Sequence, residues 1–198
     1  MFYKTILLFT SSVALTACAN LASNTPASAW QAEQEVRDFV SDGRLAVNAD
    51  GKGSYANFDW SKSDKVQTID INTPLGTTLG QLCQDEQGAL AVNSDGEVIQ
   101  ARNADELSQR LLGFSLPIQH LGAWSQGFWV NDLPHQIAAD GSLQQGEWTV
   151  KREINSENRV RSLELANSRL SVRLVFSDWQ ASGENEAKAT QCEARTQS

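Results

Sequence analysis

Histidine and cysteine, which serve many enzymes as bases, nucleophiles and metal ligands, are few in this chain. His120 and His135 are its two histidines, and no H-x-x-x-H or C-x-x-C spacing is present for a metal site. There is no G-x-S-x-G for a serine nucleophile and no G-x-x-x-x-G-K-[ST] for a nucleotide. Asp105 and Glu106 stand where a helix is expected to begin, and carboxylates there act as caps or surface charges. The sequence therefore predicts neither an enzyme nor a bound metal or cofactor.

Cys18 stands where covalent modification is expected. Residues 1–17 carry one charge, Lys4, and then an apolar run too short to cross a bilayer, which is typical of a secretory signal. The L-T-A-C motif at 15–18 resembles the lipobox of bacterial lipoproteins, whose cysteine receives a thioether-linked diacylglycerol and becomes an N-acylated first residue. The next residue is Ala19, not the aspartate that retains many lipoproteins in the inner membrane. These features predict a lipid anchor in the outer membrane, facing the periplasm; an ordinary A-x-A cleavage site is the alternative.

The chain behind this signal is long enough for one domain with a sizeable core. Cleavage before Cys18 leaves 181 of the 198 residues, and loss of Lys4 leaves 15 basic against 24 acidic side chains, a net charge of −9. That charge argues against nucleic acid and against charge-driven docking on anionic lipid. We expect a lipidated linker over 18–27, a single monomeric domain over 28–180, and a solvated, disordered tail over 181–198. Whether Cys83 and Cys192 form a disulfide in the oxidising periplasm is left open.

Hydrophobic periodicity divides this domain into helices and strands. Apolar residues at spacings of three and four after Ser28 predict a helix over 28–40, with Gln31 completing a capping box. From Gly43 the period changes to two, and tight turns separate the alternating segments, which predicts strands that pair as an antiparallel meander. The strand segments run over 43–49, 56–60, 66–72, 89–92 and 98–101, and after Pro134 they resume over 148–150, 163–165 and 172–179.

Two short helices are expected between these groups of strands. Asn103 is an N-cap and Gly113 ends the first helix, whereas Pro117 opens the second and Gly127 follows it. Each helix has one apolar stripe, so both should cover another layer. A sheet of about ten strands curls instead of staying flat. The predicted fold is therefore mainly β: a strongly curved antiparallel sheet, an incomplete, half-open barrel, that encloses an apolar cavity under a lid of short helices.

The turn after the strand over 66–72 carries an unusual residue. Pro74 fixes its own φ angle and Gly76 tolerates positive φ, so both suit a tight turn. Leu75 between them is a large apolar side chain with nothing of its own to pack on. It either folds back under the sheet as a core residue or is exposed for a purpose, and its neighbours in the sequence allow both.

Several motifs, taken in order, resemble the outer-membrane lipoprotein LolB family. They run through most of the mature chain, and none is decisive alone. The long C-terminal tail and the pair Cys83 and Cys192 depart from the family pattern but do not touch these motifs. The motifs are residues 30–40 before Gly-Arg-Leu-Ala-Val at 43–47, Phe-Asp-Trp at 58–60, Asn-Thr-Pro-Leu-Gly at 72–76, Leu-Leu-Gly and Leu-Pro-Ile within 111–118, Trp124 with a glycine three residues on, 146–148, and Ser-Asp-Trp at 177–179.

The resemblance implies a function in lipoprotein sorting. Members of the family receive outer-membrane lipoproteins from the soluble periplasmic carrier LolA and place them in the outer membrane, and an exposed leucine in a Pro-Leu-Gly loop lets insertion occur. Here that loop is Pro74, Leu75 and Gly76, and the implied partners are the carrier, the acyl chains of cargo lipoproteins and outer-membrane lipid. Apolar residues of the strands and of the second helix are the candidates for the cavity wall: Phe58, Trp60, Ile69, Ile71, Trp124, Trp148, Leu163, Leu165, Val172 and Leu174.

Physical chemistry favours a sheltered transfer for such cargo. Three acyl chains of roughly fifteen carbons expose about 40 methylenes, and at ~0.8 kcal/mol each they cost tens of kcal/mol in water. A covered apolar cavity avoids that cost. Two alternatives remain from the residues: a structural or assembly lipoprotein that binds a protein partner and never holds lipid, and a carrier of some other lipid.

Overall fold

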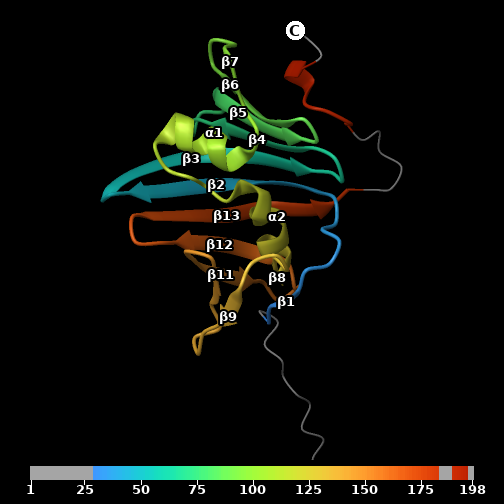
Figure 1. The fold of residues 1–198 in the computed structure, drawn as a ribbon, viewed down its shortest axis with the longest axis vertical. Helices are drawn as coiled ribbons and strands as arrows, with labels where there is room; N and C mark the ends of the chain where they lie inside the picture. The colour runs from blue at the N-terminus through green and yellow to red at the C-terminus, as the bar shows by residue number, and fades with distance from the viewer. Residues whose placement is uncertain (1–28, 183–188, 196–198) are drawn as a thin grey trace, which may run out of the picture.

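The computed structural model describes residues 29–182 and 189–195, so the signal, Cys18 and Ala19 lie outside the described residues. Eleven strands form one antiparallel sheet in the order β7-β6-β5-β4-β3-β2-β13-β12-β11-β10-β9, and two helices lie against one of its faces (Figure 1). The strands at the two ends of this order, β7 and β9, do not pair with each other, so the sheet is not closed. This confirms the predicted fold class of a curved, incomplete barrel with short helices.

Several strands are longer than the sequence pattern suggested, and β2 pairs with β13, which lies far away in the sequence. A separate parallel pair joins β1 (Gln31–Ala32) to β8 (Phe128–Trp129). The strands of the main sheet are β2 (Phe39–Ala49), β3 (Lys52–Lys62), β4 (Gln67–Asn72), β5 (Thr78–Asp85), β6 (Gly88–Asn93), β7 (Val98–Ala101), β9 (His135–Ile137), β10 (Leu143–Gln145), β11 (Trp148–Ile154), β12 (Val160–Ala166) and β13 (Leu170–Ala181).

The pairing register places apolar side chains on one face of the sheet. Leu165 lies opposite Val172, and Trp60 lies opposite Ile69. Side chains alternate between faces along a strand, so these pairs line up on a common inner face under the helices. The turns that join β2 to β3 and β4 to β5 lie at the same end of the sheet, because successive turns of a meander alternate between its two ends. We call this end, with the turns over 50–51 and 73–77, the hairpin end.

Both predicted helices are confirmed. In α1 (Ala104–Leu112) the Asn103 side chain accepts a hydrogen bond from the Glu106 N–H, and Gly113 ends the helix with φ 78°. In α2 (Ile118–Gln126) Gly127 has φ 88°, a left-handed conformation that favours glycine. Helix α1 contacts β5, β6 and β7, whereas α2 contacts β8, β11 and β12, so the two helices cover different wings of the sheet (Figure 1).

The helix predicted over 28–40 is wrong for the described residues. Gln31 and Ala32 form β1, residues 33–38 have no regular structure, and β2 begins at Phe39. The backbone hydrogen bonds of this segment go to distant partners: the Gln126 side chain accepts from the Arg37 N–H at 3.1 Å and donates to the Arg37 carbonyl at 3.0 Å. Tertiary partners therefore override the local helical pattern.

The predicted tail is partly ordered and covalently held. β13 continues to Ala181, and a disulfide joins Cys83 of β5 to Cys192, 109 residues later in the chain. Arg195, in the short 3-10 helix η1 (Glu193–Arg195), donates from Nε to Asp85 Oδ2 at 2.8 Å, and the Cys192 N–H donates to the same oxygen at 2.8 Å. A disordered tail over all of 181–198 was therefore a wrong expectation, because residues 189–195 pack on the sheet.

Candidate functional site

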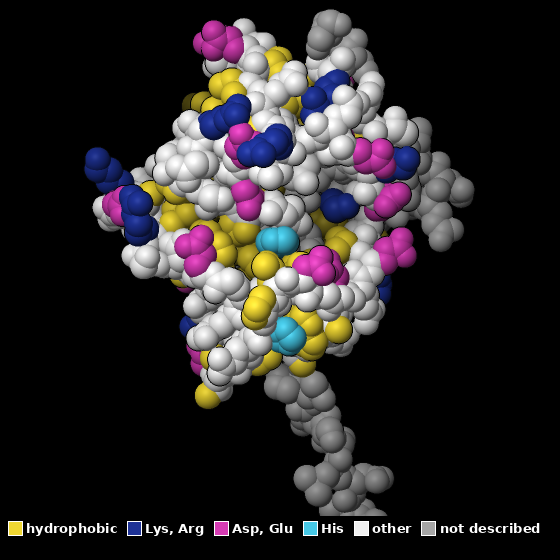
Figure 2. Space-filling model, in the orientation of Figure 1, with side chains coloured by type: hydrophobic (Ala, Val, Ile, Leu, Met, Phe, Trp, Pro, Cys, Tyr) yellow, Lys and Arg dark blue, Asp and Glu magenta, His cyan; other side chains and the backbone are white. Residues whose placement is uncertain are grey.

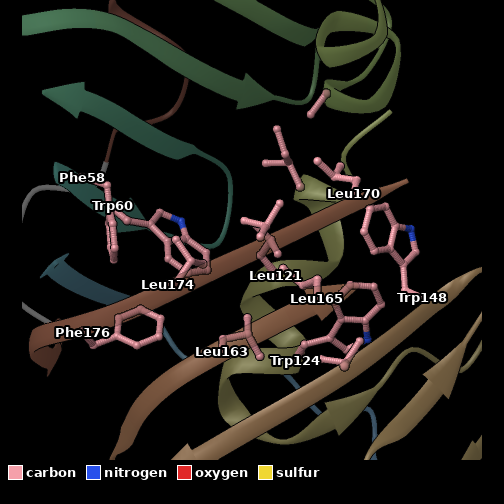
Figure 3. Close-up of a cluster of buried hydrophobic side chains, with 14 of the residues drawn as sticks. Phe58, Trp60, Leu121, Trp124, Trp148, Leu163, Leu165, Leu170, Leu174 and Phe176 are labelled. Atoms are coloured by element: carbon pink, nitrogen blue, oxygen red, sulfur yellow. The ribbon is translucent and has the colours of Figure 1, made fainter. Parts of the chain in front are cut away.

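The predicted wall residues gather in one hydrophobic cluster on the inner face. Eight of the ten are buried, and Ile69 and Ile71 are partly buried and packed against them. Figure 3 shows side chains from β3, β11, β12 and β13 meeting those of α2. The buried eight are Phe58, Trp60, Trp124, Trp148, Leu163, Leu165, Val172 and Leu174.

Aromatic rings fill the middle of this cluster. Phe39 and Trp60 meet edge to face with ring centroids 4.8 Å apart, Phe58 and Phe176 do so at 5.7 Å, and Trp60 stacks on Phe176 at 6.4 Å. The buried wall side chains leave almost no surface for a water molecule, so they pack as a core. The open apolar cavity predicted between them is therefore not present in the described residues: apolar side chains that face one another pack to stay out of water.

Part of the inner face remains accessible. Leu45, Val47 and Ala49 of β2 and Ile69 and Ile71 of β4 are only partly buried, and we call these five residues the apolar strip. It runs along both strands toward the hairpin end. In Figure 2, hydrophobic side chains surface in the centre of the face that carries the helices. The inner face is thus packed in its middle and partly open toward one end.

The Pro-Leu-Gly turn lies at that same end. The Gly76 N–H donates to the Thr73 carbonyl at 2.9 Å, the Thr73 N–H donates to the Thr77 carbonyl at 2.8 Å, and Gly76 has φ 86°. This is a three-residue hairpin loop with glycine in the left-handed position. Leu75 at its tip is 95% exposed. The structure therefore decides between the two alternatives: Leu75 is not a core residue.

A buried glutamine that the sequence patterns did not single out fixes α2 to the sheet. Gln145 Oε1 accepts from Trp124 Nε1 at 2.9 Å and from the Val130 N–H at 2.9 Å. Its Nε2 donates to the carbonyls of Val130 at 2.6 Å and Leu133 at 3.1 Å. All four bonds are needed because Gln145 is buried. Only the alternation of β10 could have indicated that this side chain points inward.

Helices α1 and α2 meet through polar groups. Gln119 Nε2 donates to Asp105 Oδ2 at 2.9 Å, and the Leu116 N–H donates to Ser108 Oγ at 2.8 Å. Burial lowers the pKa of His120 from its ordinary value, although Asp105 and Glu33 oppose that shift. Burial also raises the pKa of Asp105. Protonation near this junction is therefore more costly than in water for the imidazole and less costly for the carboxyl group.

The outer face of the sheet carries a polar depression of about 280 Å³. Asp178, Asp42, Asp59 and Asp70 lie directly opposite one another on β13, β2, β3 and β4, and they line it. Among the described residues, no group of His, Cys, Asp and Glu side chains is placed to hold a metal ion. This depression is polar, so it is not the apolar cavity that the sequence predicted.

Comparison with known proteins identifies the family. The family model described as "Outer membrane lipoprotein LolB" matches residues 37–179. This chain belongs to the LolB family. It is similar to the outer-membrane lipoprotein LolB of Neisseria meningitidis, with 52% identity over 92% of this chain and 94% of the relative, and to that of Chromobacterium violaceum, with 32% identity over 89% and 99%. The LolB-family chain is thus an outer-membrane lipoprotein.

This LolB-family chain is also similar to a solved structure, that of a LolA superfamily protein from Nitrosomonas europaea. The alignment covers 79% of this chain and 91% of the solved chain, with 12% sequence identity and a TM-score of 0.47. Within the described part of the chain, no helix is long and apolar enough to cross a membrane.

Proposed function

We propose that this LolB-family lipoprotein accepts outer-membrane lipoproteins from the periplasmic carrier LolA and inserts them into the outer membrane. Besides family membership, one observation carries the proposal. A fully projecting leucine, Leu75, stands at the same end of the sheet toward which the apolar strip runs. Acyl chains that leave the inner face at this end reach the bilayer beside Leu75.

Acyl chains enter by parting the packed core. Helix α2 is held on both sides: Gln145 binds Trp124, and Gln67 Nε2 donates to the Ile118 carbonyl at 3.2 Å. Helix α1 buries fewer side chains and meets α2 mainly through Asp105, Ser108 and their partners. The movable part of the lid is therefore α1 with the loop over 113–117. When it lifts, acyl methylenes take the place of its apolar side chains against the sheet, and each buried methylene contributes ~0.8 kcal/mol.

Transfer in this scheme runs downhill from carrier to receptor to bilayer. No nucleotide motif is present, and a step of about 1.4 kcal/mol shifts each equilibrium tenfold, so small differences in apolar fit suffice. Burying Leu75 contributes about 1.5 to 3 kcal/mol, too little to hold the protein on a membrane beside its own acyl anchor. The role of Leu75 is therefore local: it opens the leaflet where the cargo enters.

A transfer assay with labelled cargo, the carrier and outer-membrane vesicles tests the proposal. We expect Leu75→Glu to accept cargo from the carrier normally and to fail in releasing it into vesicles. Ile137→Glu is the matched control, because Ile137 is also an exposed apolar residue but lies on the edge strand β9. Normal insertion by Leu75→Glu would show that the tip leucine has no part in release.

The packed core favours one competing function. A tethered structural or assembly lipoprotein would need no cavity, and the buried wall residues fit such a protein. The same assay separates the two, because a structural lipoprotein takes up no acylated cargo from the carrier. Uptake of free lipid but not of acylated protein would instead indicate a carrier of another lipid.

A further inference from the structure

The exposed apolar surface at the hairpin end is larger than the tip leucine. Tyr55 on β3 is 81% exposed, and Leu79 at the start of β5 is 50% exposed. These two strands flank β4, so the two residues stand on either side of the Leu75 loop, about 10 Å apart across the sheet. We call Tyr55, Leu75 and Leu79 the apolar lip.

The two segments that carry the lip contain no charge, although the β2–β3 turn at the same end carries Asp50, which pairs with Arg169, and Lys52. Residues 53–58 and 71–84 contain no Asp, Glu, Lys or Arg, although a fifth of the chain is charged. Exposed apolar groups in a stretch free of charge are typical of a surface that meets lipid, and tyrosine in particular favours the level of the headgroups.

Polarity on the outer face rises in steps away from the lip. Asn57 and Asn72 lie opposite each other, Asn72 pairs with Thr78, the residue before Leu79, and the next outward-facing pair is Asp59 and Asp70. The carboxylates are held there: Asn72 Nδ2 donates to Asp59 Oδ2 at 2.6 Å. From Tyr55 to Asp59 the strand rises about 14 Å. Burying a carboxylate in hydrocarbon is costly, so this row limits how deeply the hairpin end can enter a bilayer.

The anchor keeps this surface close to lipid. Ten residues separate Cys18 from the first described residue, Ala29, and this stretch spans at most about 40 Å. That reach is close to the diameter of a domain of this size. The lip can therefore touch the same membrane that holds the acyl anchor.

We propose that the apolar lip is a bilayer-contacting surface: Leu75 inserts, Tyr55 and Leu79 lie at the headgroup level, and the carboxylates of Asp59 and Asp70 stay in water. This inference rests on the proposed function and adds its lipid-facing orientation. The domain thus meets the membrane through the lip, with the apolar strip opening toward the leaflet.

Depth-dependent quenching tests this orientation on the full lipidated protein. Single cysteines at positions 75, 55, 79 and 59 are labelled with an environment-sensitive fluorophore; Cys83 and Cys192 are paired in a disulfide and Cys18 is acylated, so each variant has one free thiol. Ser156→Cys, in the exposed turn at the opposite end of the sheet, is the control. In phosphatidylethanolamine vesicles with a minor fraction of phosphatidylglycerol and spin-labelled lipid, quenching should fall in the order 75, 55, 79, with 59 and 156 unquenched.

The possible outcomes test membrane contact by the whole lip separately from the insertion step at Leu75. If position 75 is quenched while 55 and 79 behave like 156, the lip is refuted and the insertion step stands. If position 75 is also unquenched, the membrane step of the proposed function fails as well. As a second measurement, Leu79→Asp and Tyr55→Asp should each slow cargo release about three- to tenfold, since they lose part of the transfer free energy of an apolar side chain, and Tyr55→Trp should preserve it. Unchanged release in both Asp variants would refute the lip.

Discussion

Replacing Cys192 by alanine should markedly destabilise the domain. The disulfide closes a loop over a separation of 109 residues, and the chain-entropy model assigns a loop of that length about 4.7 kcal/mol. Undocking residues 189–195 also uncovers the small outer cluster of Val66, Cys83 and Leu90. Measured losses for native disulfides are about 2 to 5 kcal/mol, so we expect Cys192→Ala to lose about 3 to 5 kcal/mol of unfolding free energy. That is a large part of the stability of a typical domain.

Urea denaturation followed by tryptophan fluorescence measures this loss. Wild-type protein in a reducing agent should match Cys192→Ala, and the reducing agent should not change the variant further. Arg195→Ala keeps the disulfide but removes the guanidinium from the buried Asp85 carboxylate, so it should cost about 1 to 3 kcal/mol. A loss below about 1 kcal/mol in Cys192→Ala, with or without reducing agent, would refute the docked segment.

Two further predictions concern the core and the lid. Gly43→Ala should destabilise by several kcal/mol, because its Cβ would lie 2.2 Å from the Val175 carbonyl oxygen and 2.9 Å from Phe58 Cζ; wild-type-like melting would contradict the close packing of β2 on β13. His120 has a lowered pKa in the folded state, so the unfolded state binds its proton first and stability should fall as the pH drops below about 6.5. His120→Gln should flatten that decline in urea titrations between about pH 7 and pH 5, and an unchanged slope would contradict it.

Local signals predicted the regular elements well where the chain provides its own caps and turns. The Asn103 cap and the glycine stops at Gly113 and Gly127 gave both helices correctly, because these hydrogen bonds close within a few residues. The alternating segments gave the strands of the meander for a similar reason: tight turns fix the register between neighbours. The exposed position of Leu75 depends on the tertiary structure, since Pro74 and Gly76 specify the turn but not its surroundings.

Long-range partners account for the errors. The segment over 28–40 has a helical pattern, but its described part pairs with β8 and with the Gln126 side chain. The C-terminal tail has no periodicity, and it is ordered by a disulfide and a buried ion pair more than a hundred residues away in sequence. Residue patterns within one segment carry no information about partners that are so distant in the sequence.

The sequence alone determined the signal and lipobox motif, the meander of strands, the two capped helices and the set of apolar residues that faces inward, because each depends on residue types within a few positions of one another. Only the tertiary structure decided that most of these inward residues pack as a core while the apolar strip stays partly open, that Leu75 projects from the same end toward which this strip runs, and that Cys83 pairs with Cys192. These features depend on how distant strands meet, and that is settled by the packing of the whole sheet.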